Sequence, residues 1–355
     1  MAKVLMKGNE AIGEAAIRAG CLNYFAYPIT PQSEVAEYLS RRMPEVGGVF
    51  LQGESEVAVS YMIFGAAAAG ARIFTTSSSP GISLMSEGIS YIAGAQCPAV
   101  FVNIMRGGPG LGGILPSQAD YLQATKGMGH GDFCLLVMAP ASVQEAVEMV
   151  MKAFPLAEKY RNPVMILGDG LIGQMMEPVE FPDNLKTEPS NKDAWATNGM
   201  DTRGSRQRNL VKSLFLDPEA LNNHNLTLKA KYEQMKKEEI MFERYHMDGD
   251  YQVLIVSYGT MSRVCRTAIE TLHAEGIEVG MLRPQTLFPF PEAAVFDGAV
   301  KASCQAVVSV EMSMGQMLED VQRSVQGTKP VHWYGKCGGD VPTPEEVTDF
   351  IHNLI

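Results

Sequence analysis

Short apolar runs alternate with helical patterns along most of this chain, and that alternation limits the possible folds more than any other feature. In the first 170 residues, strands are expected at Tyr24–Tyr27, Gly48–Gln52, Arg72–Thr76, Ala99–Met105, Cys134–Ala139 and Val164–Gly168. Helices are expected between them, at Asn9–Ala19, Pro31–Arg42, Ser55–Ala69, Gly81–Ala93, Ser117–Thr125 and Ser142–Tyr160. Uninterrupted apolar runs suit parallel strands that are covered on both faces. The pattern therefore predicts a doubly wound α/β sheet.

A second unit of the same class is expected near the C-terminus. Its strands are predicted at Val253–Val256, Val279–Leu282, Ala306–Val310 and Val331–Trp333, and its helices at Met261–Ala274, Pro291–Ala299, Gly315–Val325 and Pro344–Leu354. Between the units, prolines and polar residues interrupt the apolar pattern, and Thr227–His246 then has the spacing of one amphipathic helix. We therefore expect a doubly wound domain at 1–176, a linker arm with a helix at 177–247, and a second α/β domain at 248–355.

Charge and hydropathy exclude some classes of protein. The chain has 29 Lys and Arg against 40 Asp and Glu, a net charge of −11, which does not suit a nonspecific nucleic-acid binder or a basic membrane anchor. The longest nearly apolar run, Val57–Ala71, is shorter than the ~18 residues that a membrane span needs. Glu10 and Glu14 interrupt the N-terminal stretch, so no signal peptide is expected.

The six cysteines are scattered, with no CxxC pair and no Cys/His cluster at zinc spacing. We therefore expect no metal site and no iron–sulfur cluster on this chain. A large chain with few cysteines and no leader is typical of a cytoplasmic protein with reduced thiols.

The loops that follow four predicted strands carry the residues suited to chemistry, because α/β sheets bind ligands at the carboxyl ends of their strands. These loops are YPITP at Tyr27–Pro31, GESE at Gly53–Glu56, TTSSSPG at Thr75–Gly81 and RGGPGLGG at Arg106–Gly113. Thr30 is either a helix N-cap or a ligand-binding hydroxyl. Glu56 either complements a helix dipole or is a buried acid–base carboxylate, and Arg106 is either a surface residue or an anion-binding one.

Two further motifs resemble cofactor signatures but lack their context. Gly108–Gly113 satisfies GxGxxG, yet Pro109 and Pro116 break the helix that should open inside a dinucleotide-binding motif. Gly168-Asp169-Gly170 matches the start of a metal-pyrophosphate GDG motif, but the first Asn-Asn pair, Asn222-Asn223, is too distant to complete it.

Several motifs in one order resemble the alpha subunit of the 2-oxoacid:ferredoxin oxidoreductases, in particular the B-type chain of the 2-oxoisovalerate (3-methyl-2-oxobutanoate) branch. They are Gly8-Asn9, YPITPQSE at Tyr27–Glu34, the SE of Ser55-Glu56, SSSPGISLMSEGISYIAG at Ser77–Gly94, RGGPG from Arg106, PSQADYLQATKGMGHGD at Pro116–Asp132, LRPQTLFPFP at Leu282–Pro291 and EMSMGQM at Glu311–Met317. The resemblance implies a pyrimidine-type thiamine-diphosphate domain followed by a transketolase C-terminal-like domain. The resemblance extends over the chain except for about Glu188–Asn222.

The resemblance also implies which residues act. Glu56 matches the glutamate that binds N1′ of the thiamine aminopyrimidine, with Glu54 as its rival. Arg106 matches the arginine that holds the substrate carboxylate, and Thr30 matches the threonine that hydrogen-bonds the substrate. Pro28 and Ile29 of the same turn are expected to line the cofactor.

The implied function is the oxidative decarboxylation of a 2-oxo acid to acyl-coenzyme A and CO₂, with electrons passing to ferredoxin. Thiamine diphosphate would be shared with a beta subunit, while magnesium and iron–sulfur clusters would lie on partner subunits. The expected partners are the beta subunit, ferredoxin-like delta and gamma subunits and ferredoxin, in a homodimer of the heteromer. Alternatives are 2-oxoglutarate, pyruvate or an aryl-pyruvate as substrate, a non-catalytic assembly subunit, and a NAD-binding dehydrogenase built on Gly108–Gly113.

Overall fold

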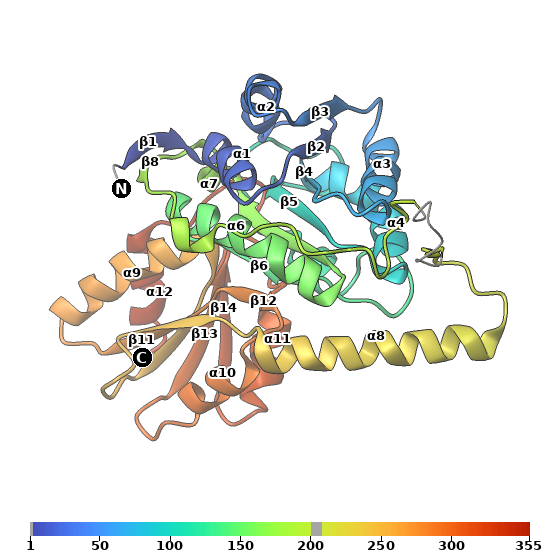
Figure 1. Ribbon diagram of the computed structural model, residues 1–355. Coiled ribbons are helices and arrows are strands. Elements are labelled where there is room, and N and C mark those ends of the chain that lie inside the picture. Colours follow the sequence, from blue (N-terminus) through green and yellow to red (C-terminus); the bar gives the residue numbers. More distant parts are fainter. Residues whose placement is uncertain (1–2, 200–207) are drawn as a thin grey trace.

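The computed structural model describes residues 3–199 and 208–355, which form two α/β units side by side (Figure 1). The larger sheet has seven strands in the order β12-β6-β7-β5-β4-β2-β3. Their bounds are β2 (Asn23–Ala26), β3 (Val49–Gln52), β4 (Phe74–Ser77), β5 (Ala99–Met105), β6 (Leu136–Met138), β7 (Pro163–Asp169) and β12 (Thr286–Phe288). All neighbours pair in parallel except β12 with β6. The predicted parallel sheet is therefore present.

Helices cover both faces of this sheet. One face carries α1 (Gly8–Arg18), α2 (Ser33–Glu45) and α6 (Val143–Tyr160) in one apolar cluster. The other carries α3 (Glu56–Ala68), α4 (Ser79–Gly94) and the short α5 (Tyr121–Thr125). Strands β4, β5 and β7 are buried along their whole length, which explains why β5 and β7 are nearly continuous apolar runs, whereas β4 carries polar residues in its buried positions.

The second unit has a five-stranded sheet in the order β14-β13-β10-β11-β9. Its strands are β9 (Phe242–Tyr245), β10 (Val253–Val256), β11 (Val279–Pro284), β13 (Ala306–Glu311) and β14 (Val331–Gly335). Helices α9 (Gly259–Ala274) and α12 (Pro344–His352) pack on one face. On the other face, α10 (Glu292–Ala299) and α11 (Leu318–Val325) join the apolar cluster of α3 and α4, so one core continues through both units.

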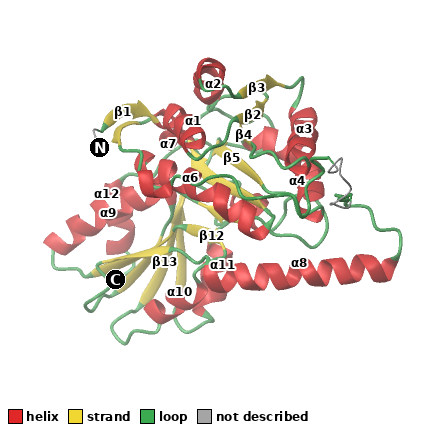
Figure 2. Cartoon of the chain, in the orientation of Figure 1, coloured by secondary structure: helices red, strands yellow, loops and turns green. Residues whose placement is uncertain are grey.

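The chain crosses between the units more often than its pattern indicates, because β12, from the C-terminal part of the chain, pairs with β6 in the larger sheet. The predicted helix Thr227–His246 is wrong: α8 (Pro218–Glu238) ends earlier, and β9 then pairs antiparallel with β11. Asp217 sets the start of α8 by accepting a hydrogen bond from the Ala220 N–H at 3.0 Å. Figure 2 shows α8 as a long helix below the first unit, and Leu228, Tyr232 and Met235 of this helix are buried in that unit's apolar cluster.

Three short elements of the first unit were not expected. β1 (Val4–Lys7) and β8 (Met176–Val179) form a separate two-stranded antiparallel sheet, and α7 (Gly170–Gln174) follows β7 directly. Each has at most five residues, which is too few for a hydrophobic period to be recognised.

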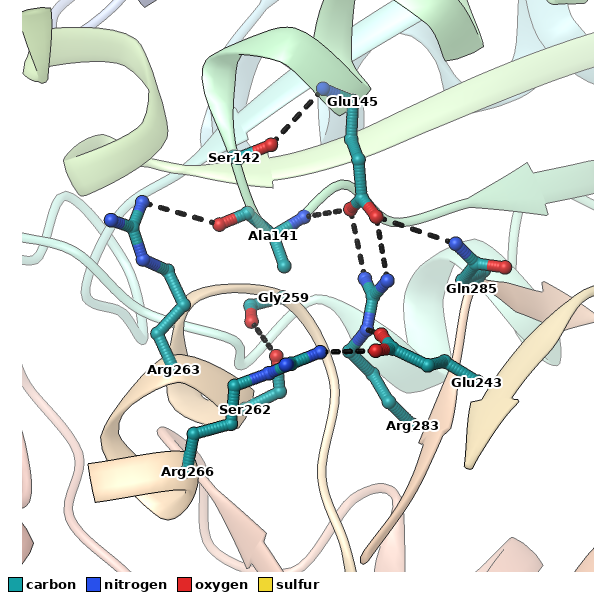
Figure 3. Close-up of polar contacts among 10 residues, drawn as sticks. All are labelled: Ala141, Ser142, Glu145, Glu243, Gly259, Ser262, Arg263, Arg266, Arg283 and Gln285. Atoms are coloured by element: carbon teal, nitrogen blue, oxygen red, sulfur yellow. Dashed lines mark hydrogen bonds and ion pairs between the residues drawn. The ribbon is translucent and has the colours of Figure 1, made fainter. Parts of the chain in front are cut away.

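A network of arginines fastens the second unit to the first (Figure 3). Arg283 of β11 is buried and binds both oxygens of Glu145 of α6, at 2.6 and 2.8 Å. Its Nε donates to Glu243 of β9 at 2.8 Å, and Glu243 also pairs with Arg266. A cavity of about 420 Å³ lies among these residues, and its arginine charges are met by carboxylates of the same chain.

Within the part of the chain that the structure describes, no helix has both the length and the apolarity needed to cross a membrane. Over the same residues, no group of three His, Cys, Asp or Glu side chains is arranged to hold a metal ion. All six cysteines are free thiols, and only Cys337 is exposed.

Candidate active site

The residues predicted to act lie at the carboxyl ends of neighbouring strands. Strands β5, β4, β2 and β3 are adjacent and parallel, so the loops that follow them meet at one edge of the sheet. Thr30 follows β2, Glu56 follows β3 and Arg106 follows β5. The sheet order, rather than the sequence order, therefore brings these residues together.

The first turn of α4 connects Arg106 with Glu56. The hydroxyl of Ser79 accepts a hydrogen bond from the Arg106 backbone N–H at 3.0 Å. Two residues later, Gly81 lies against Glu56: a Cβ added at Gly81 would be 2.8 Å from Glu56 Oε1 and 2.2 Å from Ser77 Oγ. Only glycine leaves room for these side chains, so the glycine of the SSSPG motif has a steric reason.

Glu56 is the first residue of α3, and its side chain is buried. Ser55 caps the helix, since its Oγ accepts a hydrogen bond from the Ala58 N–H at 3.2 Å. Glu56 is 5% exposed, whereas its rival Glu54 is exposed. A carboxylate that only complemented a helix dipole would not need burial. The geometry therefore favours Glu56 over Glu54 as the carboxylate of this site.

Thr30 does not cap a helix. Helix α2 begins at Ser33, and the N-cap position belongs to Gln32. Gln32 is fully buried and accepts a hydrogen bond from Thr76 of β4, which fixes the YPITP turn against the sheet. The side chain of Thr30 is exposed at the strand edge, while its carbonyl faces Arg106.

Arg106 is buried without a carboxylate partner in the part of the chain that the structure describes. Its side chain is 7% exposed, Nη1 donates to the Thr30 carbonyl at 2.9 Å and Nη2 donates to the Leu111 carbonyl at 3.1 Å. Its Nε is buried and has no hydrogen-bond partner among the described residues. The two carbonyls orient the guanidinium but leave its full charge, which is an arrangement for binding an external anion.

Three more buried polar groups lie in β4 and in the residue that joins β4 to α4. The hydroxyls of Thr75, Ser77 and Ser78 have no hydrogen-bond partner among the described residues. Buried hydroxyls normally find partners, so a group of unpaired ones indicates that something else satisfies them. Together with the buried carboxylate of Glu56, these groups fit a polar heterocycle such as the aminopyrimidine of thiamine diphosphate.

The two cofactor-like motifs have other roles. Residues 107–116 form a loop, and no helix begins inside Gly108–Gly113, so the geometry does not support a dinucleotide site there. Asp169 is buried and caps α7, accepting hydrogen bonds from the N–H groups of Leu171 and Ile172 at 2.9 and 3.2 Å. Burial raises the pKa of Asp169, and these hydrogen bonds oppose that rise.

The residues beneath Arg106 were not expected from the sequence to have a role. Asp120 accepts hydrogen bonds from Ser79 at 2.6 Å and from Asn103 at 2.8 Å. Burial raises the pKa of Asp120, and the two hydrogen bonds oppose that rise. SSSPG and PSQAD were both part of the family resemblance, and they were the signals that could have identified Ser79 and Asp120.

Comparisons with known proteins identify the family of this chain. A family model described as pyruvate flavodoxin/ferredoxin oxidoreductase, thiamine diphosphate-binding, matches residues 14–244. A model of pyruvate:ferredoxin oxidoreductase core domain II matches residues 252–347. The chain therefore belongs to the 2-oxoacid:ferredoxin oxidoreductase family, as an oxidoreductase subunit of the alpha type.

Two relatives from Methanothermobacter thermautotrophicus align over nearly their full length. Ketoisovalerate oxidoreductase subunit VorB is 47% identical over 100% of this chain and 98% of its own. The 2-oxoglutarate synthase subunit KorA is 34% identical over 98% of this chain and 97% of its own.

Solved structures confirm the fold that the resemblance implied. A 2-oxoglutarate:ferredoxin oxidoreductase from Magnetococcus marinus matches with a TM-score of 0.85 at 28% identity. This chain is covered to 99%, and it spans 65% of that longer chain. A split-gene transketolase matches with a TM-score of 0.61 at 16% identity, covering 98% of this chain and 97% of its own, and shows the shared fold alone.

Proposed function

We propose that this chain contributes half of the active site of an oxidoreductase that decarboxylates 2-oxoisovalerate to an acyl-coenzyme A and CO₂, with electrons passing to ferredoxin. The observation that carries the proposal is Arg106, a buried guanidinium with no carboxylate partner among the described residues, at the same strand edge as the buried carboxylate of Glu56. This pairing suits a substrate whose carboxylate must be bound and then expelled.

Each side chain has a distinct task in this proposal. Arg106 binds the substrate carboxylate, because a guanidinium keeps its charge when desolvated and offers two parallel donors. The Thr30 hydroxyl, exposed at the edge, donates to the oxo group of the substrate. Glu56 hydrogen-bonds the aminopyrimidine of thiamine diphosphate, and Pro28 and Ile29 line the same cofactor. When bound, thiamine diphosphate supplies the electron sink that decarboxylation needs.

Partner subunits complete the site in this proposal. Leu111, Ile114 and Leu115 follow Arg106 and are 83%, 60% and 57% exposed, an apolar patch that a beta subunit would cover. We assign to partner subunits the pyrophosphate-binding residues, magnesium and the iron–sulfur clusters. Ferredoxin-like delta and gamma subunits and ferredoxin itself complete the assembly, a cytoplasmic homodimer of the heteromer. The relatives' names, which call each of them a subunit, support an assembly of this kind.

The choice of substrate rests on the relatives. Identity is 47% to a ketoisovalerate oxidoreductase subunit and 34% to a 2-oxoglutarate synthase subunit, which favours a branched-chain acid. The exposed leucines beside Arg106 agree with an apolar substrate side chain. The competing substrates are 2-oxoglutarate, pyruvate and an aryl-pyruvate, and a non-catalytic assembly role is the competing function.

Reconstitution tests the proposal. The purified chain should show no turnover with thiamine diphosphate, coenzyme A, a viologen dye and any of the four 2-oxo acids. Co-expressed with its partner subunits, it should reduce the dye with the highest kcat/KM for 2-oxoisovalerate. Turnover by the chain alone would refute the shared site. A preference for another 2-oxo acid would correct the substrate. Activity in a complex that lacks this chain would leave the chain only an assembly role.

A further inference from the structure

Asp120 is a partly buried carboxylate that the proposed function does not use. It lies immediately before α5, and its Oδ2 accepts both the hydrogen bond from Ser79 Oγ and the one from Asn103 Nδ2. No Lys, Arg or His pairs with it among residues 3–199 and 208–355. A buried carboxylate without a cation is costly, and it is tolerated where its hydrogen bonds organise the neighbouring groups.

The direction of these hydrogen bonds leads to Arg106. Ser79 has one hydroxyl hydrogen, and its distance to Asp120 is 2.6 Å, against 3.2 Å to the alternative acceptor, the Arg106 carbonyl. Ser79 therefore donates its hydroxyl hydrogen to Asp120. The hydroxyl oxygen of Ser79 in turn accepts a hydrogen bond from the Arg106 backbone N–H at 3.0 Å. A charged acceptor polarises the hydroxyl and so strengthens the bond that the hydroxyl accepts.

Asn103 provides a second connection from the same carboxylate. It lies on β5, the strand that leads into Arg106, and its Oδ1 accepts a hydrogen bond from the Ser79 N–H at 3.1 Å. Its other side-chain atom, Nδ2, donates to Asp120. Asp120 therefore fixes the end of β5 and the start of α4 relative to each other, and these two elements hold the backbone of Arg106, from which the guanidinium extends to the Thr30 and Leu111 carbonyls.

The second unit holds the segment that carries Asp120. Asp320 of α11 accepts hydrogen bonds from Tyr121 Oη at 2.5 Å and Lys126 Nζ at 2.6 Å. Gln316 donates to the Ala119 carbonyl at 2.6 Å and accepts from the Leu122 N–H at 2.9 Å. These contacts on both sides of Asp120 keep its carboxylate in place beneath α4.

We propose that Asp120, acting through Ser79 and Asn103, is a positioning residue for Arg106. This inference rests on the proposed function, in which Arg106 binds the carboxylate of the 2-oxo acid. It assigns Asp120 no contact with substrate or cofactor. Loss of Asp120 therefore weakens binding of the oxo acid while leaving the chemical step largely intact.

Steady-state kinetics of the complete complex test the inference. Asp120→Ala should raise KM for 2-oxoisovalerate about 3–10-fold, the scale of one or two lost hydrogen bonds, with kcat within about 2-fold. Asp120→Asn keeps an acceptor without the charge and should give a smaller rise. Ser79→Ala should raise KM as well, and combining it with Asp120→Ala should add little, because both changes break the same connection.

Asp169→Asn is the control, since Asp169 is a more deeply buried carboxylate at the end of β7 and has no hydrogen bond to Ser79 or Arg106. It should lower thermal stability without changing KM. An unchanged KM in Asp120→Ala and Ser79→Ala, or additive effects, would overturn the inference. If Asp120→Ala fails to assemble, the KM values of the two single variants Asp120→Asn and Ser79→Ala decide the question. An Arg106→Lys variant with normal KM would instead overturn the proposed function.

Discussion

Arg106 and Arg283 are both buried arginines, and their surroundings differ in one decisive way. Arg283 lies at the junction of the two units and donates to both oxygens of Glu145 and to Glu243 (Figure 3). Arg106 lies at the strand edge and donates only to two backbone carbonyls, with its Nε unpartnered among the described residues. The first arginine is neutralised by its own chain, and the second keeps a charge for something else to meet.

The comparison separates a structural use of arginine from a binding use. A buried charge is stable only when it is paired or when a ligand pairs with it. Removing a structural arginine should therefore lower the free energy of unfolding and leave substrate binding intact. Removing a binding arginine should change KM and leave stability nearly intact.

The largest effect is expected at the strand edge, from Glu56→Gln in the complete complex. An amide cannot supply the charge that the bound aminopyrimidine requires, so kcat should fall by about 10²-fold or more, the scale of a positioned acid–base group. Assembly and melting temperature should stay near wild type. The exposed neighbour Glu54, changed to Gln, is the control, and a larger loss from that control would transfer the role to Glu54.

The next effect is expected from Arg106 itself. Arg106→Ala removes a charge-assisted contact of about 1.5–3 kcal/mol and should raise KM for the 2-oxo acid roughly 10–150-fold. Arg106→Lys keeps the charge but loses the two parallel donors of the guanidinium, so KM for the 2-oxo acid should rise less. KM for coenzyme A should not change in either variant. A changed KM for coenzyme A with a normal one for the oxo acid would make this loop a coenzyme A phosphate site.

A smaller effect, of the opposite kind, is expected at the junction. Arg283→Met leaves Glu145 and Glu243 without their shared cation and should cost about 1–3 kcal/mol of unfolding free energy, since both glutamates keep partial access to water. Chemical denaturation measures the loss, with Arg323→Met as the exposed control. The comparison between the two arginines fails if Arg283→Met raises KM for the oxo acid as Arg106→Ala does.

The smallest effect concerns a third arginine, Arg72. Like Arg283, it is paired with a carboxylate of its own chain, because it donates hydrogen bonds to both oxygens of Glu158. Burial alone would raise the pKa of Glu158, but the hydrogen bonds and charges of Arg72 and Lys192 lower it to about 2. Because the folded pKa lies below the ordinary value of about 4.3, the pair stabilises the fold above that pH. This stabilisation is lost as the pH falls toward 2.

Glu158→Gln should therefore cost about 1–2 kcal/mol at neutral pH and less at each step below about pH 4. Denaturant unfolding of the wild type and the variant at several pH values measures the difference. A difference that stays constant down to pH 2 would show that the loss comes from packing and not from the charge of Glu158.

Much of the fold follows from local patterns. Strands β5 and β10 have the bounds that their apolar runs predict, and most helices agree to within a few residues. Strands β9 and β12 were missed, because each is short and pairs with a strand far away in the sequence. Such pairing depends on which edge of a sheet is free, and no local period records that.

The sequence alone determined which loops are expected to carry chemistry, because Thr30, Glu56 and Arg106 each follow a recognisable strand and match the motifs of one family. Only the tertiary structure decided how these residues are used. In it Glu56 is buried and Glu54 is exposed, and Thr30 is not at the helix cap. Among the described residues, Arg106 has no carboxylate partner, whereas Arg283 has two. The physical reason is that periodicity is a property of neighbours along the chain, whereas burial and hydrogen-bond satisfaction depend on residues such as Asp120 and Ser79, 41 positions apart, meeting in space.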